Sequence, residues 1–284
     1  MTIHRNLGEI GELLLKAKAL QCMQSGEIVP AIAGPISSLH VGDFKSRRGT
    51  YSSRESYPSV GNLTALRKSG YKDLQLKLAY AGIVKAGTSM KADIQINGAN
   101  YSIKSSEKRP AIINHTFRRG FLRITKKLGL PIEPLDEEVA TYWDVRQGDE
   151  FKLGEDISGY DRRKASVFIS AEFKEYFRPL FNYFAFTGTG RSDSPAPAEY
   201  ILEFDDPTDT STWNVIPKDT FYDIAWPDLI FSVRDKLAQG QRLSSTTMPA
   251  DDKPWAQISR GKVQAQLHVR AGEGPLNRGS PRVT

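Results

Sequence analysis

A tight β-hairpin is predicted for residues 91–104 of this 284-residue chain. Apolar and polar residues alternate on both sides of Asn97-Gly98, a dipeptide that accepts the positive φ angles of a two-residue type I′ turn. Pairing through that turn places Asp93 opposite Ser102 and brings Lys104 to the same face. A four-residue loop would pair Asp93 with Lys104 instead, still on one face, because side chains alternate with a period of two. We therefore expect one apolar face and one face with a carboxylate, a hydroxyl and an ammonium.

These polar residues resemble the catalytic core of the PD-(D/E)XK nuclease superfamily, which includes most type II restriction endonucleases. In that superfamily an Asp and a second acidic residue bind Mg²⁺, and a Lys on the next strand acts near the attacking water. Asp93 and Lys104 match the pattern. Ala92 stands where the family often has Pro, and Ser102 stands where it usually has Asp or Glu. The resemblance therefore implies that a second carboxylate comes from elsewhere in the chain.

An amphipathic helix predicted for residues 7–24 can supply that carboxylate, because its apolar residues recur with helical spacing. Its start, Gly8-x-x-x-Glu12, resembles the helix that opens many restriction-like nucleases and Holliday-junction resolvases, in which the Glu points at the metal site. Glu12 is thus the candidate and Glu9 the reserve. A structural interpretation stands beside this one: Glu12 complements the helix dipole and pairs with Lys16 one turn later.

The resemblance implies a Mg²⁺ site, with Mn²⁺ as a substitute, formed by Asp93, Glu12 and the main-chain carbonyl of Ile103. Mg²⁺ is usually bound through one or two carboxylates together with water and substrate phosphate. Lys104 would position or activate the attacking water. Ser102 would take part as a hydrogen-bonding residue of the same site.

Charge is divided unevenly along the chain. Residues 42–130 contain 18 Lys and Arg against 5 Asp and Glu, a difference of +13, whereas residues 131–230 contain 9 against 21, a difference of −12. A basic segment of this size attracts polyanions, and phosphate neutralisation supplies much of the affinity of DNA-binding proteins. A solvated charged face is the alternative. Because the basic segment surrounds the hairpin, double-stranded DNA is the predicted partner.

Six side chains of the basic half are candidates for DNA contact. Three lie in a loop-forming segment, and three lie in or just before a segment in which basic and aromatic residues alternate. Arg and Lys reach phosphates, and together with Asn they read base edges in the major groove. The six residues are Lys45, Arg47, Arg48, Asn114, Arg118 and Arg119.

One α/β (α+β) nuclease domain is predicted for residues 1–270, with a restriction-endonuclease-like mixed central sheet flanked by helices. Residues 1–130 form its basic, catalytic and DNA-facing half, and residues 131–230 form an acidic, aromatic half that we expect to supply core and a dimer surface. Residues 231–270 are a closing strand region. The Gly-, Pro- and Arg-rich residues 271–284 are predicted to be a disordered tail.

Composition favours a cytoplasmic location. Cys22 is the only cysteine, which excludes internal disulfides and fits a reducing compartment. The sequence has no apolar run long enough to span a membrane, and its start lacks the layout of a signal peptide. We therefore expect no membrane partner.

These features predict a type II site-specific deoxyribonuclease, a Mg²⁺-dependent hydrolase of the phosphodiester bonds of duplex DNA. A homodimer is expected because a palindromic site calls for two-fold symmetry, and a restriction system would also include a cognate DNA methyltransferase. A Holliday-junction resolvase or repair nuclease of the same fold is one alternative. A catalytically inactive DNA-binding module, with Ser102 as a trace of lost metal binding, is another, and a nuclease toxin acting on RNA is a third.

Overall fold

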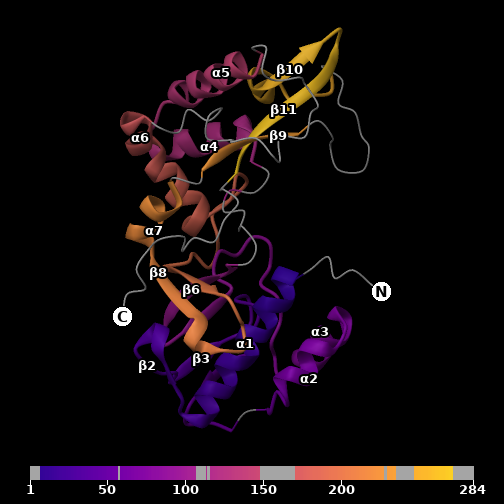
Figure 1. Cartoon of the computed structure of the whole chain (residues 1–284), viewed down its shortest axis with the longest axis vertical. Coiled ribbons are helices and arrows are strands. Elements are labelled where there is room, and N and C mark those ends of the chain that lie inside the picture. The colour runs from indigo at the N-terminus through magenta and orange to yellow at the C-terminus, as the bar shows by residue number, and fades with distance from the viewer. Residues whose placement is uncertain are drawn as a thin grey trace.

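The computed structural model describes residues 7–56, 58–106, 113, 116–147, 170–226, 229–234 and 246–270. Asn114 and the predicted tail lie outside these described residues. The described elements form a mixed α/β fold, in which a six-stranded mixed sheet is flanked by helices (Figure 1). The predicted fold class is therefore confirmed.

The predicted N-terminal helix and hairpin are both present. Helix α1 spans Leu7–Ser25. Strands β5 (Ile94–Ile96) and β6 (Ala99–Ser105) are joined by Asn97 and Gly98, whose φ angles are 51° and 86°. Ile96 pairs with Ala99 and Ile94 with Tyr101, so the two-residue turn is confirmed. The ladder ends there, and Asp93 lies just beyond it, where its main-chain N donates to the Tyr101 carbonyl and its carboxylate accepts from Ser102 Oγ.

The central sheet combines both halves of the chain. Its strand order is β4-β3-β5-β6-β7-β8, and all neighbours are antiparallel except β6 and β7. The parallel β6–β7 pair joins the basic half to the acidic half, so the hairpin is held from both sides. The four other strands are β3 (Ser38–His40), β4 (Thr50–Ser52), β7 (Tyr200–Phe204) and β8 (Trp213–Pro217).

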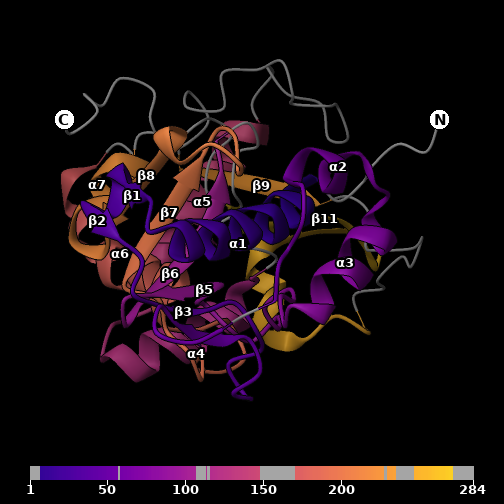
Figure 2. The same cartoon turned by 90° about the horizontal axis from the view of Figure 1, so that it is seen from below.

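One face of the sheet is covered by α1, which packs on β3 and β6 and lies across the strands in Figure 2. Helices α2 (Leu63–Lys68) and α3 (Tyr71–Tyr80) pack against α1 in turn. The apolar face of the hairpin is buried here, which confirms the alternation predicted for it. The buried hairpin residues are Ile94, Ile96, Tyr101 and Ile103.

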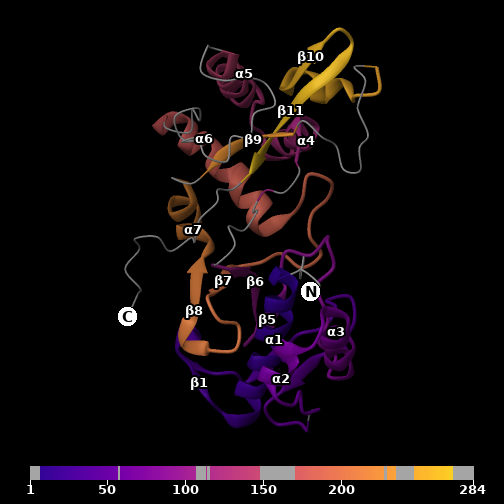
Figure 3. The ribbon, with the colours of Figure 1, turned by 45° about the vertical axis from the view of Figure 1, so that its right-hand side comes forward.

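The other side of the sheet packs on an aromatic core formed mainly by the acidic half, in which Ile201 and Ile216 of the sheet meet Phe and Tyr side chains of the helices. Figure 3 shows α4 and α6 at the end of the molecule opposite α2 and α3. Helix α6 continues through Pro179 and is followed by a π-helical turn, η3. The elements are α4 (Arg118–Leu128), α5 (Glu133–Gln147), α6 (Ala171–Asn182), η3 (Tyr183–Thr187) and α7 (Lys218–Ala225).

The closing strand region forms a second sheet rather than an extension of the first. Its strand order is β10-β11-β9, with antiparallel neighbours. A short two-stranded ribbon, β1 (Ile28–Val29) with β2 (Gly34–Pro35), follows α1. Among the described helices, none is both long and apolar enough to cross a bilayer. The strands of the second sheet are β9 (Ile230–Arg234), β10 (Ala256–Ser259) and β11 (Lys262–Arg270), and the 3₁₀ helix η7 (Ala250–Trp255) precedes β10.

Glu138 on α5 gives a pH-dependent contribution to stability. Burial, reinforced by the charge of Glu137, raises the pKa of the Glu138 carboxyl from 4.5 to about 7, and its buried Oε2 has no hydrogen-bond partner in the part of the chain that the structure describes. The folded state therefore retains a proton that the unfolded state has lost, so stability falls as the pH rises from about 4.5 through about 7.

Glu138→Gln should remove this loss. The difference in free energy of unfolding between the variant and wild type should be about 1–2 kcal/mol more in favour of the variant at pH 8 than at pH 5. Urea unfolding at the two pH values measures the difference. Glu172→Gln, at an exposed position on α6, is the control and should show no such pH dependence. An equal effect of Glu138→Gln at both pH values would contradict the assignment.

Candidate active site

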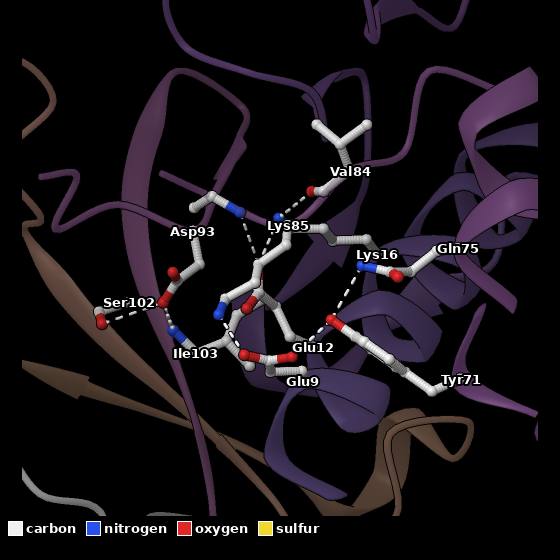
Figure 4. A network of polar contacts seen from close by, with 11 residues as sticks. Glu9, Glu12, Lys16, Tyr71, Gln75, Val84, Lys85, Asp93, Ser102 and Ile103 are labelled. Carbon is white, nitrogen blue, oxygen red and sulfur yellow. Dashed lines mark hydrogen bonds and ion pairs between the residues drawn. The ribbon is translucent and has the colours of Figure 1, made fainter. Parts of the chain in front are cut away.

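The polar face of the hairpin brings Asp93 into direct contact with Ser102 and with the main chain of Ile103 (Figure 4). Asp93 Oδ2 accepts hydrogen bonds from Ile103 N at 2.7 Å and from Ser102 Oγ at 3.1 Å. Lys104 Nζ donates to Ser102 Oγ at 2.8 Å. Ser102 therefore connects the carboxylate to the ammonium and fixes their separation.

The main chain of Ile103 also faces Asp93. In an extended strand, the N–H and C=O of one residue point toward the same neighbouring strand. The Ile103 N–H points at Asp93, so the Ile103 carbonyl points to the same side of the strand. This part of β6 lies beyond the Ile94–Tyr101 pair, at which the β5–β6 ladder ends. The carbonyl is thus placed where a cation bound by Asp93 could use it.

Helix α1 brings Glu12 to Asp93. The Glu12 side chain is almost fully buried, and its Oε1 accepts hydrogen bonds from Lys16 Nζ at 2.7 Å and from Ala86 N at 3.1 Å. Burial and then the charge of Asp93 raise the pKa of the Glu12 carboxyl, so the two carboxylates are close enough to repel. Figure 4 shows both side chains at the same junction between α1 and the hairpin.

Glu9, the reserve candidate, has different partners. It accepts a hydrogen bond from Tyr71 Oη at 2.5 Å and forms an ion pair with Lys85. These contacts tie α1 to α3 and to the segment that follows it. Of the two predicted acids, the one that interacts with Asp93 is Glu12.

The pair with Lys16 that the structural interpretation of Glu12 predicts is confirmed. Lys16 is fully buried and also donates to the carbonyl of Val84 at 2.8 Å. A buried ammonium needs a compensating charge, and Glu12 supplies it. Glu12 therefore balances Lys16 through Oε1, while within the described residues Oε2 has no donor.

The oxygen atoms at this junction fit Mg²⁺. The described residues contain no cluster of three or more His, Cys, Asp or Glu side chains that could hold a metal. Two carboxylates and a carbonyl match the smaller protein share of a Mg²⁺ shell, completed by water and phosphate. Asp93 Oδ1, like Glu12 Oε2, has no donor among the described residues, and a cation between the two carboxylates would remove their repulsion.

A pocket of about 250 Å³ opens beside Asp93 and is lined by residues that include Ser102, Lys104 and Lys91. Lys91 is a site residue that the sequence analysis missed. It donates to the carbonyl of Phe184 in η3, and burial, followed by the charge of Lys104, lowers the pKa of its ammonium to about 8. A signal existed, because Lys91 lies two residues before Asp93 and an extended segment places such residues on one side.

The loop between β3 and β4 carries three of the DNA-contact candidates. Lys45, Arg47 and Arg48 are exposed, and Arg48 Nη2 also donates to the carbonyl of Ala79 at 3.0 Å. Phe44 of this loop packs against a small apolar cluster that contains residues 90 and 92. The loop therefore lies beside the segment that leads to Asp93.

The candidates on α4 have structural partners. Arg118 forms two 2.7 Å hydrogen bonds with the carboxylate of Asp136 on α5. Arg119 lies at the start of the same helix, where its main-chain N donates to Asp252 Oδ1 at 3.0 Å. The Arg118 guanidinium thus joins two helices, and a DNA contact by Arg118 stays a prediction. Arg119 keeps a half-exposed side chain.

No family model, curated protein or solved structure matches this chain. The functional interpretation therefore depends on the residues of the site and on the resemblance of their pattern.

The buried pair makes a stability prediction. Glu12→Gln leaves the Lys16 ammonium buried without its countercharge and should lower the free energy of unfolding by about 3 kcal/mol. Adding Lys16→Met removes the stranded charge and should recover most of that loss. Urea unfolding of both variants measures this. Glu9→Gln, which breaks a more exposed pair, should change stability by less than about 1 kcal/mol. A double variant no more stable than Glu12→Gln would contradict the pairing.

Proposed function

We propose that this chain is a Mg²⁺-dependent endonuclease that hydrolyses phosphodiester bonds of double-stranded DNA at a specific sequence, as type II restriction enzymes do. One observation carries the proposal: α1 brings Glu12 to Asp93 at the end of a hairpin whose polar face also holds Lys104. Ser102 leaves the hairpin without a second carboxylate, and the neighbouring helix supplies one.

The roles follow from the contacts. Asp93, Glu12 and the Ile103 carbonyl would hold Mg²⁺, or Mn²⁺ in its place, and a bound metal would polarise the scissile phosphate and lower the pKa of its water. The Ile103 N–H fixes the orientation of Asp93. Lys104, held by Ser102, would position the attacking water and offset charge on the phosphate.

The surroundings agree with a DNA substrate. Lys45 and Arg47 are exposed on the β3–β4 loop beside the site and would contact the backbone. A homodimer would present one such site to each strand of a palindrome. As a restriction enzyme, the protein would act in the cytoplasm alongside a cognate DNA methyltransferase.

Cleavage of plasmid DNA tests the proposal. Asp93→Asn keeps an acceptor for the Ile103 N–H but loses the charge, and Lys104→Met keeps the length of the side chain but loses the ammonium. Each should lower the rate of Mg²⁺-dependent cleavage at least about 100-fold, while duplex binding, measured by fluorescence anisotropy in Ca²⁺, changes little. Discrete bands from the wild type favour a restriction enzyme, and cutting of branched DNA alone favours a resolvase. Normal cutting by either variant would refute the site.

A catalytically inactive DNA-binding module is the second candidate. One observation favours it: the charge of Glu12 is already compensated by Lys16, and Ser102 is neutral. Among the described residues, Asp93 is then the one carboxylate at the junction without an ion-pair partner, and a single carboxylate is a weak metal site. A wild-type protein that binds duplex DNA but cuts none in Mg²⁺ or Mn²⁺ would establish this alternative.

The double variant Glu12→Gln/Lys16→Met separates the two roles of Glu12. If the carboxylate binds the metal, this variant should fold with near-wild-type stability yet cleave plasmid DNA at least about 100-fold more slowly. Its melting temperature provides the folding control. Wild-type cleavage by the double variant would show that Glu12 serves only to balance Lys16.

A further inference from the structure

The pocket beside Asp93 contains two ammonium groups that form no ion pair with a carboxylate of the described residues. Lys91 donates to the Phe184 carbonyl and Lys104 to the Ser102 hydroxyl. Neither lysine forms an ion pair with any described residue. Lys91 is partly buried, and among the described residues its ammonium has one hydrogen-bond acceptor, a neutral carbonyl, with the charge of Asp93 nearby. Such an arrangement favours an anion from outside the chain.

The pocket lining can accommodate that anion. Among the described residues of the lining, Asp93 is the one acid, and its Oδ2 atom already accepts two hydrogen bonds from the hairpin. Two ammoniums against one carboxylate give this described part of the lining a net positive charge. The hydroxyl of Thr88 adds a neutral donor of the kind that binds phosphate oxygens. The hydroxyl hydrogens of Ser102 and Thr189, which also line the pocket, are already donated to Asp93 and to the Ser192 carbonyl.

We propose that this pocket binds a phosphate group, with Lys91 as a second phosphate-binding cation beside Lys104. Its volume of about 250 Å³ lies just below the range of about 300–1,000 Å³ typical of pockets for drug-sized ligands, which suits a phosphate and the atoms next to it. The inference extends the proposed nuclease function by a residue outside the Asp93–Lys104 pattern. Binding itself needs neither metal nor hydrolysis, so it can be measured separately.

Inorganic phosphate is the first probe. Isothermal titration in EDTA should give a dissociation constant at least ten-fold higher for Lys91→Met than for wild type. Lys91→Arg keeps the charge and should bind within a few-fold of wild type. Lys253→Met, at an exposed lysine that does not line the pocket, is the matched control. Equal affinity of Lys91→Met and Lys253→Met for phosphate, together with no change in duplex binding, would overturn the proposal.

Duplex DNA is the second probe, because a backbone diester and a free phosphate share the same chemistry. If the pocket holds a backbone phosphate, Lys91→Met should lower the slope of log affinity against log salt concentration by about 1, as expected for one lost phosphate contact. A defect with inorganic phosphate alone would identify a free phosphate or a monoester as the ligand.

Lys91→Met also removes a donor to Phe184, so its melting temperature is measured first. Should it unfold at the assay temperature, acetylation of Lys91 in the wild type, followed by mass spectrometry, replaces it. Phosphate or duplex DNA should protect Lys91, and equal labelling with and without both ligands would overturn the proposal.

The outcomes separate this inference from the nuclease itself. A wild type that binds phosphate through Lys91 but never cuts DNA keeps the pocket and removes the enzyme. If the wild type cuts DNA but Lys91→Met binds phosphate and duplex DNA as the wild type does, the nuclease function is supported and the phosphate-binding role of Lys91 is refuted.

Discussion

The buried ion pair between Lys16 and Glu12 ties the first helix to the rest of the site. Lys16 donates to the Val84 carbonyl and Glu12 accepts from the Ala86 main chain, so the pair fastens α1 to the segment that leads into the hairpin. A charge buried in this way is tolerated only when it is paired and hydrogen-bonded. The same geometry brings the Glu12 carboxyl group near enough to Asp93 for their charges to interact. Stability of the helix junction and assembly of the site are thus served by one contact.

The two oppositely charged halves of the chain contribute different parts of the same site. The basic half supplies Asp93, Lys104 and Lys91, while the acidic half supplies β7 beside β6 and the Phe184 carbonyl that accepts from Lys91. The main chain of Lys91 is also held by the acidic half, through Ser194 Oγ and the Ala196 carbonyl. The aromatic residues of the acidic half form a hydrophobic core. The acidic half therefore supports the hairpin from the side of its polar face.

Local patterns predicted the parts of this site that lie close in sequence. Asn97-Gly98 fixed the turn and therefore the register of Asp93 with Ser102, and helical spacing placed Glu12 one turn before Lys16. Contacts between distant segments left no comparable signal. The Arg118–Asp136 pair, which links two helices, is one such contact.

The same lack of a local signal applies to the second lysine of the site. The partner of Lys91 is a main-chain carbonyl in a π-helical turn about ninety residues later, and no side-chain pattern encodes such an acceptor. Where a group bonds to a distant main chain, the fold has to be known before its role can be inferred.

The two-residue turn makes the length of the hairpin as important as its composition. Side chains alternate with a period of two, so one residue inserted between β5 and β6 that shifts their pairing by a single position would exchange the two faces of one strand relative to the other. Ser102 and Lys104 would then point toward α1, and the side chain of Ile103 would enter the pocket. We infer that sequence drift can change many side chains around this turn, whereas insertions and deletions within it separate Asp93 from its partners in one step.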